Sequence, residues 1–154
     1  MSEGDILYFG TYKGEPIAWK ILKTEADKML LITEEPIAEK PFHDTIKKVT
    51  WETSYLRTWL NGEFLNSFST EQKNQIIATN TGSTEDKIFL SSLDEMVELV
   101  NAEKITFKTT DEWWTRTSSE DGIMYATSNG WVKAVGDQVV RDKGVRPCIW
   151  IDLT

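Results

Sequence analysis

The segment ILYFGTYKGEPIAWKILK, residues 6–23, decides the fold class of this chain of 154 residues. It holds two short runs rich in isoleucine, leucine and aromatic residues, and a lysine-glycine turn separates them. In the second run Ile17, Trp19 and Ile21 share one face, because side chains alternate along a strand. A third run, KMLLITEEPI (28–37), follows after another turn. The chain is therefore predicted to begin with a meander of three antiparallel strands.

The middle of the chain has the spacing of helices. The stretch TWETSYLRTWLNGEFLNSF (50–68) repeats apolar residues every three or four positions, and its apolar stripe includes Leu56 and Trp59. We expect both side chains to be buried. The Asn61-Gly62 pair predicts a break or a C-terminal cap within this stretch.

Two further helices are indicated by the reciprocal capping pattern of a serine followed three residues later by glutamate or glutamine. Ser69 begins one such pattern and Ser92 begins the other. In the second helix the predicted buried stripe is Leu93, Met96, Val97 and Val100. A short strand is expected between the two helices, at residues 87–91.

The last third returns to β structure. WWTRT (113–117) reads as a strand, and IMYATSNGWVKAV (123–135) contains Asn129-Gly130, a strong hairpin signal when both residues take positive φ. VRPCIWIDL (145–153) is predicted to be the closing strand. The fold class is therefore α+β: one domain over residues 1–154, with antiparallel sheets and two to three helices in the middle.

Composition excludes several classes of function. The net charge of −8 and the isoelectric point near 4.7 argue against a nucleic-acid partner. The single cysteine, Cys148, leaves no internal disulfide and no cysteine-based zinc site. No run approaches the ~20 apolar residues of a membrane helix. We expect a soluble protein without cofactor, metal or membrane partner, cytoplasmic as the sequence stands, or extracellular if a leader precedes it.

Catalytic signatures are weak, and we assign no catalytic residue. The chain has one histidine, His43, which we expect at the surface or capping a helix. It has no phosphate-binding glycine loop. A small hydrolase using paired acidic residues is kept as an alternative, with its pair drawn from Glu112, Glu120, Asp121 and Asp137.

Four segments together resemble an uncharacterised bacterial domain family, domain of unknown function 6273. They are TWETSYLRTWLNGEF, DKIFLSS, DEWWTRTSSEDG and GVRPCIWIDL, in this order along the chain. The third departs from the family's Trp-Trp-Leu-Arg-Ser-Pro-Gly block after the arginine. The closing block is more distantly similar to the end of C-type-lectin-like domains. That similarity implies a C-type-lectin-like fold whose N- and C-terminal strands are paired and whose long irregular region carries the ligand.

The predicted site residues come from the strand pattern and the hairpin. Trp114 and Arg116 share a strand face, where arginine stacks on indole and needs an acid nearby. We predict that Trp114, Arg116 and Trp131 contact a ligand, and that Asp86 and Arg146 form a buried structural ion pair. A purely structural role for these groups stays open.

The function that this sequence favours is a non-enzymatic binding or interaction module for a carbohydrate or protein ligand. The alternatives are the small hydrolase and a purely structural domain of a larger phage or cell-surface assembly.

Overall fold

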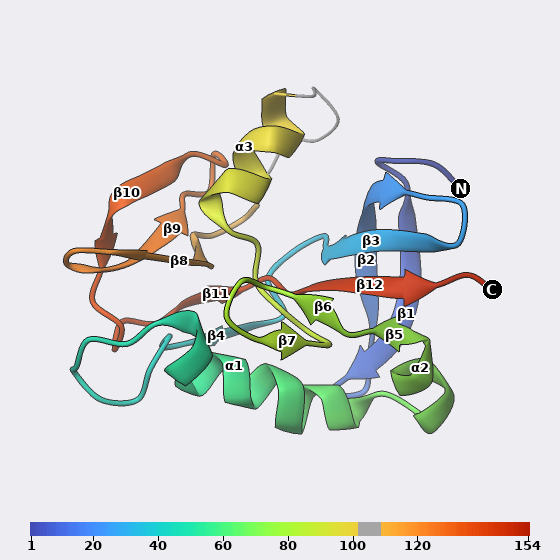
Figure 1. Cartoon of the computed structure of the whole chain (residues 1–154), viewed down its shortest axis with the longest axis horizontal. Helices are drawn as coiled ribbons and strands as arrows, with labels where there is room; N and C mark the ends of the chain where they lie inside the picture. The colour runs from blue at the N-terminus through green and yellow to red at the C-terminus, as the bar shows by residue number, and fades with distance from the viewer. Residues whose placement is uncertain (102–108) are drawn as a thin grey trace.

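The structure is a computed structural model that describes residues 1–101 and 109–154 (Figure 1). Two sheets lie next to each other. Helices α1 (Tyr55–Trp59) and α2 (Thr70–Gln75) run along one side of them, and α3 (Leu93–Asn101) stands on the opposite side (Figure 1). The predicted α+β class with largely antiparallel sheets is confirmed.

The first sheet contains the predicted meander, which is confirmed. Its strand order is β1-β2-β3-β12-β5. Lys13 and Gly14 both take positive φ, 51° and 81°, which is the backbone that a two-residue hairpin turn requires. The strands are β1 (Ile6–Tyr12), β2 (Glu15–Thr24), β3 (Lys28–Thr33), β12 (Cys148–Asp152) and β5 (Ile76–Ile77).

The closing strand joins this sheet but does not pair with the opening strand. β12 pairs with β3, from Cys148 opposite Ile32 to Asp152 opposite Lys28, and with β5 on its other side. The predicted pairing of the N- and C-terminal strands is therefore wrong, although both lie in one sheet. Burial gives the reason: β3 and β12 are largely buried and take central places, whereas the more exposed β1 lies at the edge.

The second sheet has the order β10-β9-β8-β11-β4, and its β8–β11 pair is parallel. The predicted hairpin forms, but its turn differs from the expected type, because Gly130 has φ 84° while Asn129 does not take positive φ. The amide of Gly130 donates to Thr127 O, and the amide of Thr127 donates to Trp131 O. The strands are β4 (Ala38–Lys40), β8 (Trp113–Ser119), β9 (Gly122–Ala126), β10 (Val132–Asp137) and β11 (Lys143–Val145).

The stretch predicted as one broken helix consists of several short helical types, which are continuous from Tyr55 to Ser67, with Ser54 extended before them. A 3-10 turn (Trp51–Thr53) precedes α1, and a π turn (Leu60–Phe64) and a second 3-10 turn (Leu65–Ser67) follow it. No break occurs at Asn61-Gly62, since the π turn includes both residues. Leu56 and Trp59 are buried, as predicted.

The two capping predictions are confirmed, but the buried face of α3 is not as expected. Ser69 with Gln72 and Ser92 with Glu95 exchange the reciprocal hydrogen bonds. In α3, Met96 and Leu99 are buried, while Val97 and Val100 are 46% and 45% exposed. The apolar periodicity of this helix continues onto a second face, which the core does not cover.

Residues 87–91 form no regular strand. Two short strands, β6 (Thr79–Asn80) and β7 (Glu85–Asp86), pair just before them, and Phe89 makes an isolated bridge to Cys148. Ile88, Phe89 and Leu90 are buried. A buried irregular backbone needs hydrogen-bond partners other than a neighbouring strand.

Candidate functional site

Asp86 is the centre of a buried polar cluster. Its side chain is 1% exposed and accepts hydrogen bonds from Arg57 Nε at 2.7 Å and from Trp51 Nε1 at 2.9 Å. The hydroxyls of Thr81 and Thr84 also donate to it, at 3.0 and 2.7 Å. Burial opposes ionisation of this carboxyl, but the hydrogen bonds from Thr84, Trp51, Arg57 and Thr81 together hold the pKa of Asp86 below its usual value.

Asn61 fixes the irregular segment that follows Asp86. Its carboxamide oxygen accepts from the amides of Lys87 and Ile88, at 3.1 and 3.0 Å. Its nitrogen donates to Arg57 O and Ile88 O, at 3.1 and 2.8 Å. One side chain thus supplies the ladder hydrogen bonds that a neighbouring strand would otherwise give, and for this reason the buried segment need not be a strand.

Arg146 is fully buried, but its partners are not those predicted. Its Nε donates to Thr33 O at 2.7 Å and its Nη2 donates to Glu34 O at 3.0 Å, while the guanidinium lies 5.0 Å from the ring centre of Trp113. Burial lowers the pKa of Arg146 to about 10. The predicted Asp86–Arg146 ion pair is wrong, because Arg57 reaches Asp86 from α1.

The predicted ligand residues on β8 face inward. Trp114 is fully buried, donates from Nε1 to Lys40 O at 2.9 Å and packs edge-on against Phe42. Both faces of β8 are covered at this point, so the indole that was predicted to contact a ligand has no exposed surface in this structure. Arg116 donates two hydrogen bonds, of 2.7 and 2.6 Å, to the carboxylate of Glu95 in α3. This ion pair connects α3 to the second sheet.

Lys143 forms a further cluster, which the sequence analysis missed. Its side chain is 3% exposed, and its ammonium lies 2.8 Å from Glu112, 2.9 Å from Asp137 and 3.9 Å from the ring centre of Tyr125. Burial would lower the pKa of Lys143, but the hydrogen bonds to Asp137 and Glu112 raise it above its usual value. A lysine beside glycine in an apparent turn gave no signal of burial.

The same cluster bears on the hydrolase alternative. Burial would raise the pKa of Asp137, but the hydrogen bond from Lys143 lowers it, so this carboxyl is a poor proton donor near neutral pH. Glu120 and Asp121 are exposed at the β8–β9 turn. In the described part of the chain no three metal-ligating residues gather as a metal site. His43 caps α1, its Nδ1 accepting from the amide of Tyr55 at 3.0 Å, as one of its two predicted roles.

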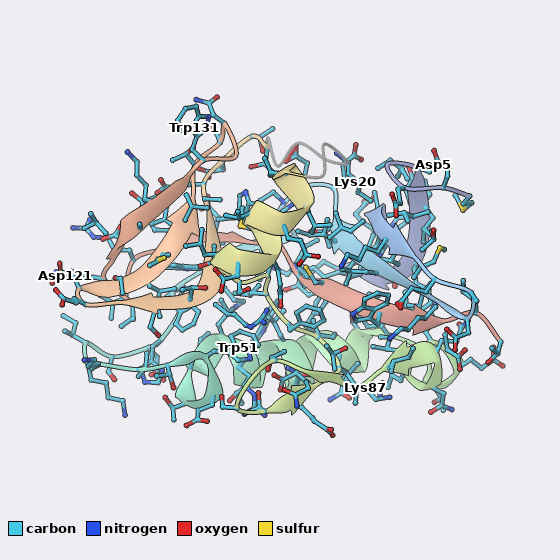
Figure 2. The ribbon with its side chains drawn as sticks, turned by 45° about the horizontal axis from the view of Figure 1, so that its top comes forward. Asp5, Lys20, Trp51, Lys87, Asp121 and Trp131 are labelled. Carbon is cyan, nitrogen blue, oxygen red and sulfur yellow. The ribbon has the colours of Figure 1, made fainter. Side chains whose placement is uncertain are left out.

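Trp131 is the exception among the seven tryptophans. The other six are buried or half-buried, whereas Trp131 is 76% exposed at the turn between β9 and β10. Figure 2 shows Trp131 on the outer side of that turn, away from the interior position of Trp51. Its two neighbours, Gly130 and Val132, line a groove of about 190 Å³ together with Leu93, Met96, Val97 and Val100 of α3. We call this feature the α3 groove.

The part of the chain that the structure describes holds no helix with the length and apolar character needed to cross a bilayer.

The chain was compared with known protein families, curated proteins and solved structures. The family described as Domain of unknown function (DUF6273) matches residues 26–153, from the β2–β3 turn to the end of β12. No curated protein and no solved structure matches the chain.

Proposed function

The chain belongs to the DUF6273 family of domains of unknown function, and we propose that it is a non-enzymatic module that binds an apolar segment of a protein partner. The segment would lie in the α3 groove and pack against Trp131. This proposal retains Trp131 as a ligand contact, gives Arg116 the role of positioning α3, and omits the buried Trp114.

The observation that carries this proposal is the exposure of Trp131 beside an uncovered apolar helix face. The indole of Trp131 is exposed, its chain neighbours Gly130 and Val132 line the groove, and Val97 and Val100 of that groove are also exposed. Apolar area left in water in this way marks interaction sites. Tryptophan is also enriched among the residues that contribute most to binding. The arrangement is specific to this position, because the chain buries its other tryptophans.

The chemistry of the groove favours a protein over a carbohydrate. Sugar binding needs an aromatic face together with several converging hydrogen-bonding groups, whereas the α3 groove is lined by aliphatic side chains and one glycine. Asp94 and Glu98 lie on the same helix and are exposed, and the chain carries a net charge of −8. An apolar segment flanked by lysine or arginine complements this surface in both respects.

Selection from a random peptide library against the intact chain tests the proposal. We expect the enriched peptides to combine apolar side chains with basic flanks. Trp131→Ala should weaken the binding of these peptides at least about tenfold, as for a residue central to an interface. Tyr8→Ala is the matched control, since Tyr8 is 71% exposed on the edge strand β1. Peptides that bind Trp131→Ala as tightly as the unmodified chain would overturn the proposal.

A glycan array run in parallel tests the carbohydrate alternative. Glycans that bind through Trp131 while no peptide is enriched would replace the protein partner with a sugar. If neither class binds, the purely structural role in a larger assembly becomes the better proposal.

One observation favours the hydrolase alternative, at a different place from the residues predicted. The hydrogen bond between Glu39 and Asp111 raises the pKa of Glu39, so the two carboxyls form an acidic pair. They line an exposed hollow of about 260 Å³. Hydrolysis of a panel of chromogenic glycosides and esters that is lost in Glu39→Gln would support this alternative, and equal rates in both proteins would remove it.

The likeness to C-type-lectin-like domains is also a proposal. Its support is that β1 and β12 share one sheet near the two chain ends (Figure 1). β2 and β3 lie between these strands, so the direct pairing of that fold is replaced by a meander.

A further inference from the structure

A second hollow lies between the first sheet and α3, and it shares no lining residue with the α3 groove. Its volume is about 140 Å³. Most of its lining residues are apolar. Leu22, Phe89 and Leu99 are buried, and Leu30 and Trp150 are half-buried.

Ser91 is one of the residues that line this hollow. The residue is 3% exposed, and within residues 1–101 and 109–154 its Oγ has no hydrogen-bond partner. Its backbone is held in place, because Ser91 O accepts from the amide of Arg116 at 3.0 Å. A buried hydroxyl without a partner is costly, so this group indicates that the hollow takes something that forms a hydrogen bond.

Cys148 adds no charge to the wall. It is 1% exposed, and burial raises the pKa of its thiol to about 12, so the sulfur is neutral at physiological pH. Its backbone exchanges two hydrogen bonds with Phe89, of 2.7 and 3.1 Å. The thiol therefore acts as a small, fixed, weakly polar surface.

The charged residues of the hollow are balanced in pairs. Glu98 lies 3.6 Å from Lys23, and Glu95 lies 2.6 Å from Arg116. The side chains of Lys23 and Glu98 are 39% and 71% exposed, so this pair marks the open end. No excess charge remains for an ionic ligand to neutralise, and an ion moved into the apolar part would lose its hydration without compensation.

We infer that this hollow binds a small neutral molecule of about one ring, with one hydroxyl or carbonyl group hydrogen-bonded to Ser91 Oγ. An apolar cavity of about 150 Å³ in another small protein accommodates benzene, which sets the size. The ring packs against Phe89 and Leu30, and its polar group replaces the partner that Ser91 lacks. Phenol is the simplest probe with both features.

NMR titration of the full chain with phenol, benzene and benzoate tests this inference. We expect phenol and benzene to bind, and benzoate to bind much more weakly because it is charged. Ser91→Ala should weaken the binding of phenol about three- to tenfold, which corresponds to the loss of one hydrogen bond. The same variant should leave the binding of benzene nearly unchanged. Ser83→Ala, in an exposed turn, is the matched control and should alter neither probe.

A second variant locates the bound probe. Leu30→Phe adds volume to the wall at a half-buried position and should abolish binding of phenol and benzene alike. The inference is overturned if the unmodified chain binds neither probe, which means that the hollow holds water alone. It is also overturned if Ser91→Ala affects both probes equally.

The outcome is independent of the peptide-binding proposal. Trp131→Ala should leave phenol binding unchanged, and Ser91→Ala should leave peptide binding unchanged. Failure at one surface therefore says nothing against the other.

Discussion

The Asp86 cluster and the α3 groove lie on different sides of the molecule and differ in which side chains they bury. The cluster removes polar groups from water, whereas the groove leaves apolar groups in it. Around Asp86, the charged and polar groups are buried or half-buried, and four of them donate hydrogen bonds to the Asp86 carboxylate. In the α3 groove the apolar side chains of Val97 and Val100 are exposed, and so is Trp131 in the adjoining turn. The first arrangement holds the chain together, and the second exposes apolar area that contributes nothing to the core.

The segments that carry the family resemblance contain several residues of the Asp86 cluster. Trp51, Arg57, Asn61 and Asp86 all belong to the first two of those segments, and their side chains bind one another or the backbone between them. The α3 groove is lined by residues of α3 and by Gly130 and Val132, all of which lie outside the four segments. The residues of the Asp86 cluster that lie in these segments therefore stabilise the fold, whereas the proposed binding surface lies outside the segments.

Removing the carboxylate at the centre of the cluster should have the largest effect. Asp86→Ala leaves Arg57, the indole of Trp51 and two threonine hydroxyls without their common acceptor. We expect the free energy of unfolding to fall by about 3–5 kcal/mol, as for the loss of one partner of a buried ion pair. Urea titration followed by circular dichroism measures it.

Asp121→Ala is the control for that experiment. Asp121 is exposed at the β8–β9 turn and should change stability by less than about 0.5 kcal/mol. If the two variants are equally stable, the Asp86 cluster does not stabilise the fold and does not differ in that respect from an exposed surface residue.

The next largest effect is expected at Asn61. Asn61→Ala leaves the amides of Lys87 and Ile88 without acceptors, and each unsatisfied group costs about 1–3 kcal/mol, so we expect a loss of roughly 2–4 kcal/mol. Hydrogen exchange should also become faster at these two amides. Asn66→Ala, at an exposed position, is the control. Unchanged exchange at Ile88 would mean that the segment is held by packing alone.

Much of the fold could be predicted, because it follows from local chemistry. The meander depends on alternating apolar residues and on a Lys13-Gly14 turn that takes positive φ. The helix starts at Ser69 and Ser92 depend on hydrogen bonds within four residues. In each case the deciding partners are neighbours in the sequence.

The errors arose where partners are distant in the sequence. Any of several arginines is long enough to reach Asp86, and only the placement of α1 selects Arg57 over Arg146. Strand alternation predicted opposite faces for Trp113 and Trp114 but could not show that both faces are covered. In α3 the periodicity predicted one buried stripe that included Val97 and Val100, but the neighbouring elements cover Met96 and Leu99 and leave those two valines exposed.

A smaller effect is expected from the pH dependence of the cluster. The pKa of Asp86 is lowered in the folded state, so its contribution to stability is present above the unfolded pKa near 3.9 and is lost as pH falls through the folded pKa. Asp86→Asn removes this ionisation. The difference in unfolding free energy between the unmodified chain and Asp86→Asn should therefore narrow as the pH falls below about 4.

Denaturant titrations at several pH values between neutrality and strong acid measure that difference. A gap that stays constant or widens in acid would contradict the lowered pKa of Asp86. Asp137→Asn is a useful comparison, because the pKa of Asp137 is also lowered, by a hydrogen bond from Lys143 of the second sheet.

The smallest effect on stability is expected at Trp131, although this residue is the largest that the chain exposes. Its indole is 76% exposed, so Trp131→Ala removes little buried area and should change the free energy of unfolding by no more than about 1 kcal/mol. Thermal melts beside Asp86→Ala and the exposed control Tyr8→Ala give the comparison directly. If Trp131→Ala is more destabilising than Asp86→Ala, the indole belongs to the core and the α3 groove loses its main binding residue. If Trp131→Ala melts like Tyr8→Ala yet abolishes peptide binding, the side chain serves recognition and not stability, which is the division of roles that separates the groove from the Asp86 cluster.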